Sequence, residues 1–159
     1  MKFQKPYVFG LIALSTILFT PHAQAEKNSA DYALMGKRLW TAFECSALAD
    51  LADDKKEQER LFILGYSEGK IFLRALREEK IKKEDLSNAV PSILLFLLQG
   101  PSDDFILGRI FENALENATE NAFDAYTKTG ADEEVKKRTA EDDFWKKNCK
   151  LIIADSLSQ

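Results

Sequence analysis

The chain has 159 residues, of which 26 are acidic and 22 are basic, giving a formal net charge of −4 at neutral pH. Nucleic-acid binding depends on Lys and Arg that neutralise phosphates, so a net acidic chain without a basic cluster argues against that class of function. The length predicts one domain with a core of its own.

The first 25 residues have the order of parts found in a secretory signal peptide. Lys2 and Lys5 precede an uncharged, mostly apolar run over residues 7–19, and Ala23 and Ala25 supply the small residues of a cleavage site. The run is shorter than the roughly 20 residues that cross a bilayer. We therefore predict a signal peptide over residues 1–25 with cleavage after Ala25. A periplasmic domain over residues 26–159 follows, with no stable membrane insertion.

Cleavage at that site changes the composition. The only histidine, His22, is lost, and the remaining residues carry 20 basic and 26 acidic side chains, a net charge of about −6. The two cysteines, Cys45 and Cys149, would be in an oxidising compartment, where a lone pair of cysteines favours a disulfide. Such a bridge closes a loop of about 100 residues, worth about 4–5 kcal/mol in the chain-entropy model.

Apolar residues spaced by three or four predict a first helix over residues 28–51. Asp54 and Glu57 have the spacing of an N-cap and its reciprocal partner at the start of a second helix over residues 55–79. Gly65 and Gly69 lie on one face of this helix. Each costs about 1 kcal/mol of helix propensity relative to alanine, so we expect a neighbouring helix to approach closely there.

A charged connector is predicted over residues 81–85, with Ser87 as the cap of a third helix that contains the apolar run 93–98. Because that run is apolar on all sides, we expect it to be the central, buried helix. Gly100-Pro101 ends it. Ser102, followed by two aspartates, then starts a fourth helix to about residue 126.

After a turn around Gly130, residues 132–138 predict a short charged helix, and Thr139 has the spacing of a cap for a last helix. That helix would bury Trp145, Cys149 and Ile152. No segment shows the strict alternation of a strand. The predicted fold is all-α, a single-domain bundle of about five helices with one disulfide.

Catalysis by the usual groups is not expected. Without histidine, serine or cysteine catalysis lacks its common base, and metals lack their commonest ligand. A disulfide also removes both thiolates. Carboxylates remain, but neither Glu44 nor Glu68 has a context that singles it out. We predict no catalytic residue, no metal site and no cofactor.

Two features could contact a protein partner. The segment over residues 65–69 has Gly65, Tyr66, Glu68 and Gly69, and tyrosine is favoured at contacts because it buries area and keeps a polar tip. The alternative is that its glycines serve helix packing. Four-residue spacing also aligns a row of carboxylates beside a row of asparagines, for which the alternative is a solvated helix face. These residues are Glu112, Glu116, Glu120 and Asp124, and Asn113, Asn117 and Asn121.

The order of these parts resembles that of the amidase-immunity proteins of type VI secretion. The matching parts are the signal peptide, a helix with Cys45, the Gly65-Tyr66-x-x-Gly69 motif, a polar connector, an apolar helix before Pro101, an alanine-rich helix, and Cys149 close to Trp145. The resemblance covers most of the chain after residue 25. It implies a small, helical, periplasmic and often dimeric protein that blocks a cell-wall amidase.

The working hypothesis is a non-enzymatic periplasmic binding protein, such as an immunity protein or inhibitor of a secreted cell-wall-active enzyme, with a homodimer left open. A second hypothesis is an acid-stress holdase, because 26 carboxylates would make the net charge positive below a pH of about 4 and self-repulsion would expose residues 93–98. A third is a carboxylate-based peptidoglycan hydrolase.

Overall fold

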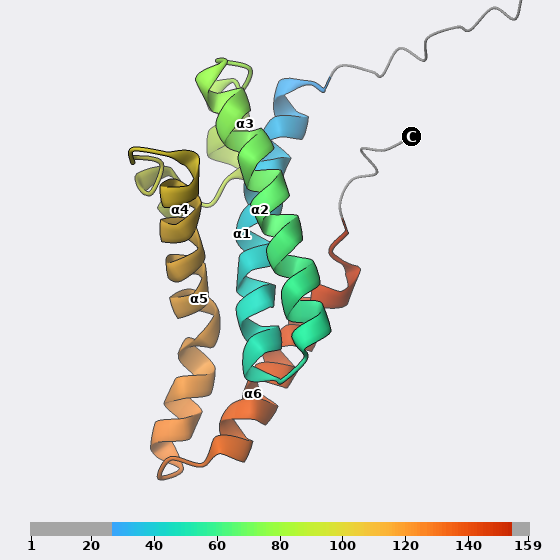
Figure 1. The fold of residues 1–159 in the computed structure, drawn as a ribbon, viewed down its shortest axis with the longest axis vertical. Helices are drawn as coiled ribbons and strands as arrows, with labels where there is room; N and C mark the ends of the chain where they lie inside the picture. The colour runs from blue at the N-terminus through green and yellow to red at the C-terminus, as the bar shows by residue number, and fades with distance from the viewer. Residues whose placement is uncertain (1–26, 154–159) are drawn as a thin grey trace, which may run out of the picture.

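The computed structural model describes residues 27–153, which form an all-α bundle closed by one disulfide (Figure 1). The helices are α1 (Ser29–Leu51), α2 (Lys55–Arg77), α3 (Lys83–Ala89), α4 (Ser92–Phe96), α5 (Asp103–Lys128) and α6 (Glu133–Lys146), followed by the 3₁₀ turn η1 (Cys149–Leu151). No strand occurs in this range. The predicted fold class is confirmed. The predicted signal peptide and its cleavage site lie outside the described residues.

α1 is the central helix of the bundle. It packs against α2, α5 and α6, and it also contacts α3. Ala33, Gly36 and Ala42 are buried along it, and small residues of this kind allow neighbouring helices to approach closely. A Cβ on Gly36 would lie 2.7 Å from the ring of Phe72 on α2, closer than packed atoms tolerate. α1 is therefore buried on several faces, and α5 and α2 lie on either side of it in Figure 1.

The apolar run over residues 93–98 is not the central helix, and that prediction is wrong. It supplies the five-residue α4 and the turn that follows, in which Leu94 and Leu97 are buried while Ile93 and Phe96 are exposed. Prolines bound this segment on both sides, and proline can neither continue a helix nor donate a backbone hydrogen bond. The run is consequently too short to take the central position.

Local capping begins α2 and α5 as predicted. Asp54 accepts a hydrogen bond from the backbone N–H of Glu57 at 3.2 Å, and Ser102 accepts one from Phe105 at 3.2 Å. The reciprocal half of the cap at α2 does not form, because the Glu57 carboxylate pairs with Arg60 at 2.8 Å. That pairing uses the same carboxylate, so α2 begins with a single side-chain cap.

α3 occupies most of the segment that the sequence predicts as a connector, and the predicted cap Ser87 lies inside it. The start of this helix is fixed by a distant residue. Ser29 on α1 accepts a hydrogen bond from the backbone N–H of Lys82 at 2.7 Å and donates one to Asp85 at 2.5 Å. Local sequence gives no sign of these contacts, which explains the error.

The C-terminal part is one helix rather than two. α6 is capped by Asp132, and the predicted cap Thr139 lies within it, where its hydroxyl donates to the carbonyl of Val135 at 2.8 Å. The predicted burial of Trp145 is also wrong, since Trp145 is 63% exposed. The chain leaves the helix after Lys146 and turns through Asn148, whose φ is 56°, so the spacing of a continued helix does not apply.

The predicted disulfide is present between Cys45 on α1 and Cys149 after α6, with Cα atoms 5.5 Å apart. Both cysteines are fully buried, in a cluster with Leu48, Ala140 and Phe144. The bond therefore fixes α6 onto the C-terminal half of α1. Within residues 27–153, no helix is both long and apolar enough to cross a bilayer.

Candidate partner-binding surface

Gly65 and Gly69 lie where α2 packs against α1 and α5, and both are buried. A Cβ on Gly65 would lie 2.6 Å from the ring of Phe43, and one on Gly69 would meet Leu107 and lie 3.1 Å from Leu39. The expectation of close helix approach is confirmed. Neither glycine offers its backbone to a partner in this fold.

Glu68 is also buried, with 2% of its surface exposed. Its carboxylate pairs with the guanidinium of Arg38 on α1 at 3.1 Å. A carboxylate buried in this way needs a cationic partner, because desolvation of a charge is costly. Glu68 therefore holds α2 to α1 and does not form part of an accessible surface.

Tyr66 is the member of the predicted segment that reaches the surface, with 38% of the residue exposed. Its hydroxyl donates to Asp104 at the start of α5 at 2.7 Å, and Lys70 approaches the same carboxylate at 3.0 Å. The Tyr66 hydrogen bond and Lys70 hold the pKa of Asp104 below its usual range, and the Asp104 hydrogen bond raises the pKa of Tyr66. The polar tip is thus occupied while part of the ring stays accessible.

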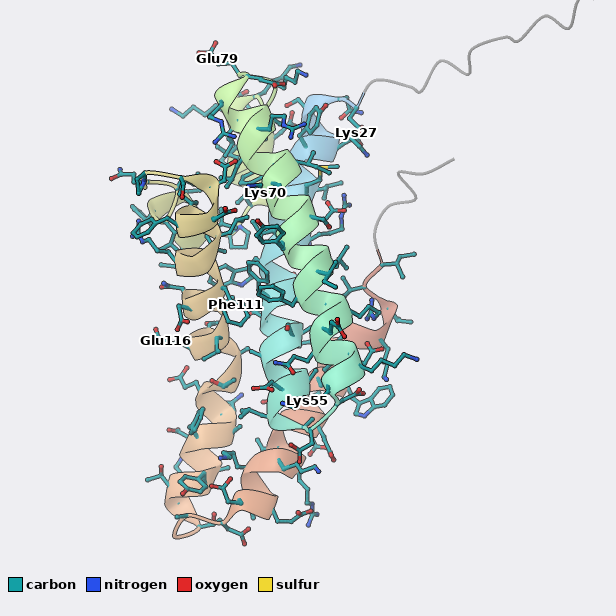
Figure 2. The ribbon with its side chains drawn as sticks, viewed as in Figure 1. Lys27, Lys55, Lys70, Glu79, Phe111 and Glu116 are labelled. Carbon is teal, nitrogen blue, oxygen red and sulfur yellow. A yellow bond between two sulfur atoms is a disulfide. The ribbon has the colours of Figure 1, made fainter. Side chains whose placement is uncertain are left out.

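Three aromatic side chains form a continuous surface between α2 and α5, which we call the aromatic seam: Phe62, Tyr66 and Phe111. Phe62 stacks on Tyr66 with ring centres 6.4 Å apart and meets Phe111 edge-on at 5.4 Å. Beneath them lies the buried ring of Phe43, 5.3 Å from Phe111. Figure 2 shows Phe111 between α5 and the α1–α2 pair. Phe62 is 41% exposed, so the seam is open to solvent along α2.

Phe62 and Phe111 are not among the candidate surface residues that the sequence predicts. The available signal was the four-residue spacing of Phe62 and Tyr66, which places two aromatic rings on one face of a helix. The same spacing is typical of the buried apolar face of a helix. The position of α5 decides whether the two rings are buried or exposed. Because α2 and α5 meet through few contacts, the rings are covered on one side only.

The glutamate row lies on another face. Glu112, Glu116 and Glu120 are exposed, and Figure 2 shows Glu116 projecting away from the bundle. None of the three forms an ion pair with another residue of the range 27–153. The structure does not bring this row together with Tyr66, because the row points outward from α5 and Tyr66 lies on α2.

The asparagine side chains, in contrast, donate hydrogen bonds to other groups of the same chain. Asn117 donates to the buried carboxylate of Glu44 at 2.6 Å, and Asn121 donates to Asp143 at 3.3 Å. The carboxylate of Glu44 also pairs with Lys147 at 3.2 Å. Asn113 donates to a carbonyl of its own helix at 3.0 Å. Asn117 and Asn121 therefore link α5 to α1 and α6.

The buried carboxylates of Glu44, Glu68 and Asp143 each have a cationic or amide partner. Over residues 27–153, no group of three or more His, Cys, Asp or Glu side chains is arranged to hold a metal ion. Of the four residues named in the predicted segment, Tyr66 alone is exposed, and it belongs to the aromatic seam.

Comparison with known proteins adds no assignment. A scan against protein-family models and searches of curated proteins and of solved structures all give no match to this chain.

Proposed function

We propose that this protein is a non-enzymatic periplasmic binding protein that contacts another protein through the aromatic seam. The observation that carries the proposal is the ring contact of Phe62 with Tyr66 and with Phe111 at a partly exposed boundary between two helices. Clustered aromatic side chains supply much of the binding energy in protein interfaces, because they bury large areas with little loss of conformational freedom. The occupied Tyr66 hydroxyl fixes one ring of the seam in place.

The partner that we propose is a secreted enzyme acting on the cell wall, with the protein serving as its inhibitor or immunity protein. The support is the order of sequence parts described above, together with a rigid, disulfide-closed helical scaffold. A preorganised surface loses little conformational entropy on binding, which suits a tight inhibitor.

Affinity capture from a periplasmic extract at neutral pH tests this proposal. The oxidised domain over residues 26–159 should retain one stoichiometric protein, identified by mass spectrometry, and Phe62→Gln should lose it. Glutamine is a good helix former, so α2 is preserved. Phe123→Gln is the matched control, because Phe123 is 46% exposed on α5 but lies outside the seam. Equal capture by both variants, or no stoichiometric protein, would contradict the proposal.

A second candidate function is an acid-stress holdase, and one observation favours it. Ion pairs join α2 to the first turn of α5: Arg77 Nη2 lies 2.9 Å from Asp103, and Lys70 lies 3.0 Å from Asp104. Arg77 lowers the pKa of Asp103, so this contribution is present above the unfolded pKa and is lost as the pH falls through the lower folded value. Acid would therefore weaken the polar contacts between α2 and the start of α5. Protection of an aggregating client at pH 3 but not at pH 7 would support this candidate, and its absence would exclude it.

A further inference from the structure

A small hollow lies beside the disulfide, between the end of α1 and α6. Its volume is about 210 Å³, and Ala49 and Ala52 of α1 and Phe144 and Trp145 of α6 form its apolar lining. Sites for small molecules usually span about 300–1,000 Å³. The hollow is below that range and has room for one long side chain of a protein partner.

Trp145 gives the hollow an accessible aromatic wall. It is 63% exposed, whereas the other tryptophan, Trp40, is 7% exposed and belongs to the core. The ring of Phe144 meets Trp145 edge-on with centres 6.2 Å apart and supports it from the buried side. Tryptophan is the residue type most enriched among the anchors of protein interfaces, because its large ring pairs an apolar body with one polar group.

The charges around the hollow leave one carboxylate open. Lys150 lies 3.5 Å from Asp54 and 3.9 Å from Glu57, so its charge is shared between two carboxylates. Glu141, four residues before Trp145 on the same face of α6, forms no ion pair with any residue in the described range. Lys137, one turn earlier, is paired with Asp53 at 3.0 Å, and Glu141 adds to Asp53 in raising the pKa of Lys137 without forming an ion pair with it. An open carboxylate therefore stands beside an open indole face.

We propose that this hollow binds one arginine side chain of a protein partner. The guanidinium would stack on the Trp145 ring and pair with Glu141, while the aliphatic stem would lie over Ala49 and Ala52. A planar guanidinium can stack on an aromatic face and still donate to a carboxylate in its own plane. The compact ammonium of lysine cannot make both contacts as well. The proposal deepens the proposed function and rests on it, because it names a second anchor for a protein partner.

Titration of the oxidised protein with N-acetyl-arginine methylamide tests the inference without any partner. The indole N–H resonance of Trp145 should shift saturably, with a dissociation constant on the order of millimolar for one side chain, while that of buried Trp40 stays fixed. The citrulline analogue, which has the same shape but no charge, should bind at least about tenfold more weakly. Glu141→Gln should weaken binding of the arginine probe about tenfold, whereas Glu116→Gln should not change it.

No saturable shift of Trp145, equal shifts with the citrulline analogue, or unchanged binding in Glu141→Gln would each overturn the inference. Trp145→Phe keeps an aromatic ring and checks that the signal reports this hollow, since the shift must disappear with the indole. Failure of this titration leaves capture by the aromatic seam untouched. Failure of the capture experiment, in turn, leaves the titration standing, so the two results are distinguishable.

Discussion

The two ends of the bundle are held together by different means. At the disulfide end, formed by the C-terminal half of α1, the second half of α5 and residues 132–153, a covalent bond and partly buried polar contacts add to the exposed ion pairs: Cys45–Cys149, the Glu44–Asn117 hydrogen bond and the Asn121–Asp143 hydrogen bond. At the α3–α4 end, residues 78–109, two short helices are joined to the rest by buried apolar side chains such as Leu94, Leu97 and Leu107, by the hydrogen bonds of Ser29, and by exposed ion pairs. The first end therefore carries a covalent bond that a change of charge does not break, whereas the second carries ion pairs that depend on charge.

Buried carboxylates and exposed ion pairs have different roles at the two ends. At the disulfide end, the buried carboxylate of Glu44 contacts Asn117 of α5 and Lys147 after α6, and so specifies how these elements fit onto α1. Exposed pairs such as Lys70–Asp104 contribute little individually because water screens them. They connect elements that can move apart, and the aromatic seam lies between the two regions.

The largest expected effect is the loss of the disulfide. Replacing both cysteines by alanine should lower the free energy of unfolding by about 4–5 kcal/mol, because the unfolded chain regains a loop of about 100 residues. Urea denaturation of the wild type and of the Cys45→Ala/Cys149→Ala variant measures the change. A loss below about 1 kcal/mol would mean that the disulfide end is held mainly by packing.

A glycine substitution tests the junction between the two ends. Gly69→Ala places a methyl group against Leu107 and Leu39, and we expect a net loss of about 1–2 kcal/mol after the gain in helix propensity. Gly108→Ala is the matched control, because a Cβ there meets nothing within 4 Å, and it should be stabilising by up to about 1 kcal/mol. Thermal unfolding of both variants gives the comparison, and a stabilised Gly69→Ala would contradict the packing account.

Much of this fold is predictable from the sequence, because the spacing of apolar residues and the capping residues indicate where long helices begin and end. α1, α2 and α5 follow the predicted bounds closely, and Cys45 and Cys149 were paired from their number and compartment. The α3–α4 end was missed, because Ser29 fixes α3 from a distance of more than 50 residues along the chain. A local pattern cannot encode such a contact.

The candidate surface was predicted less well than the fold. The segment over residues 65–69 is distinctive in the sequence, but three of its four named residues are buried by packing, and of the four only Tyr66 is exposed. Whether Phe62 faces the core or the solvent depends on where α5 lies. Whether Trp145 is buried or exposed depends on where α6 ends. Both are tertiary facts that spacing alone cannot decide.

Acid should destabilise the α3–α4 end before it destabilises the disulfide end. The pKa of Asp103, lowered by Arg77, and that of Asp104, lowered by Tyr66 and Lys70, mean that their contacts are lost as the pH falls below about 4. As the pH falls below about 4, amide protection factors in the first two turns of α5 should therefore decrease before those around Cys45 do. Lys137 also lowers the pKa of Asp53, but the disulfide retains α6 there.

The Asp103→Asn/Asp104→Asn variant provides the control for that experiment. It should show weakened protection at the start of α5 already at neutral pH, and little further change on acidification. Simultaneous loss of protection at both ends would mean that the bundle responds to acid as one unit.

The smallest effect is expected for the glutamate row. Glu112, Glu116 and Glu120 are exposed and unpaired within residues 27–153, so changing any one to glutamine should alter the free energy of unfolding by no more than about 0.5 kcal/mol. Denaturant titration of the three single variants checks this. A loss of more than about 1 kcal/mol would show that the row is part of the fold rather than a solvated face.

The most direct test of the central claim is side-chain oxidation footprinting of the oxidised protein, alone and in a periplasmic extract. If a partner binds the aromatic seam, Phe62 and Tyr66 become protected from oxidation in the extract. Phe96 and Phe123, which are exposed outside the seam, are then oxidised equally in both samples. Unchanged oxidation of Phe62 and Tyr66, or protection confined to Phe96 or Phe123, would contradict binding through the aromatic seam.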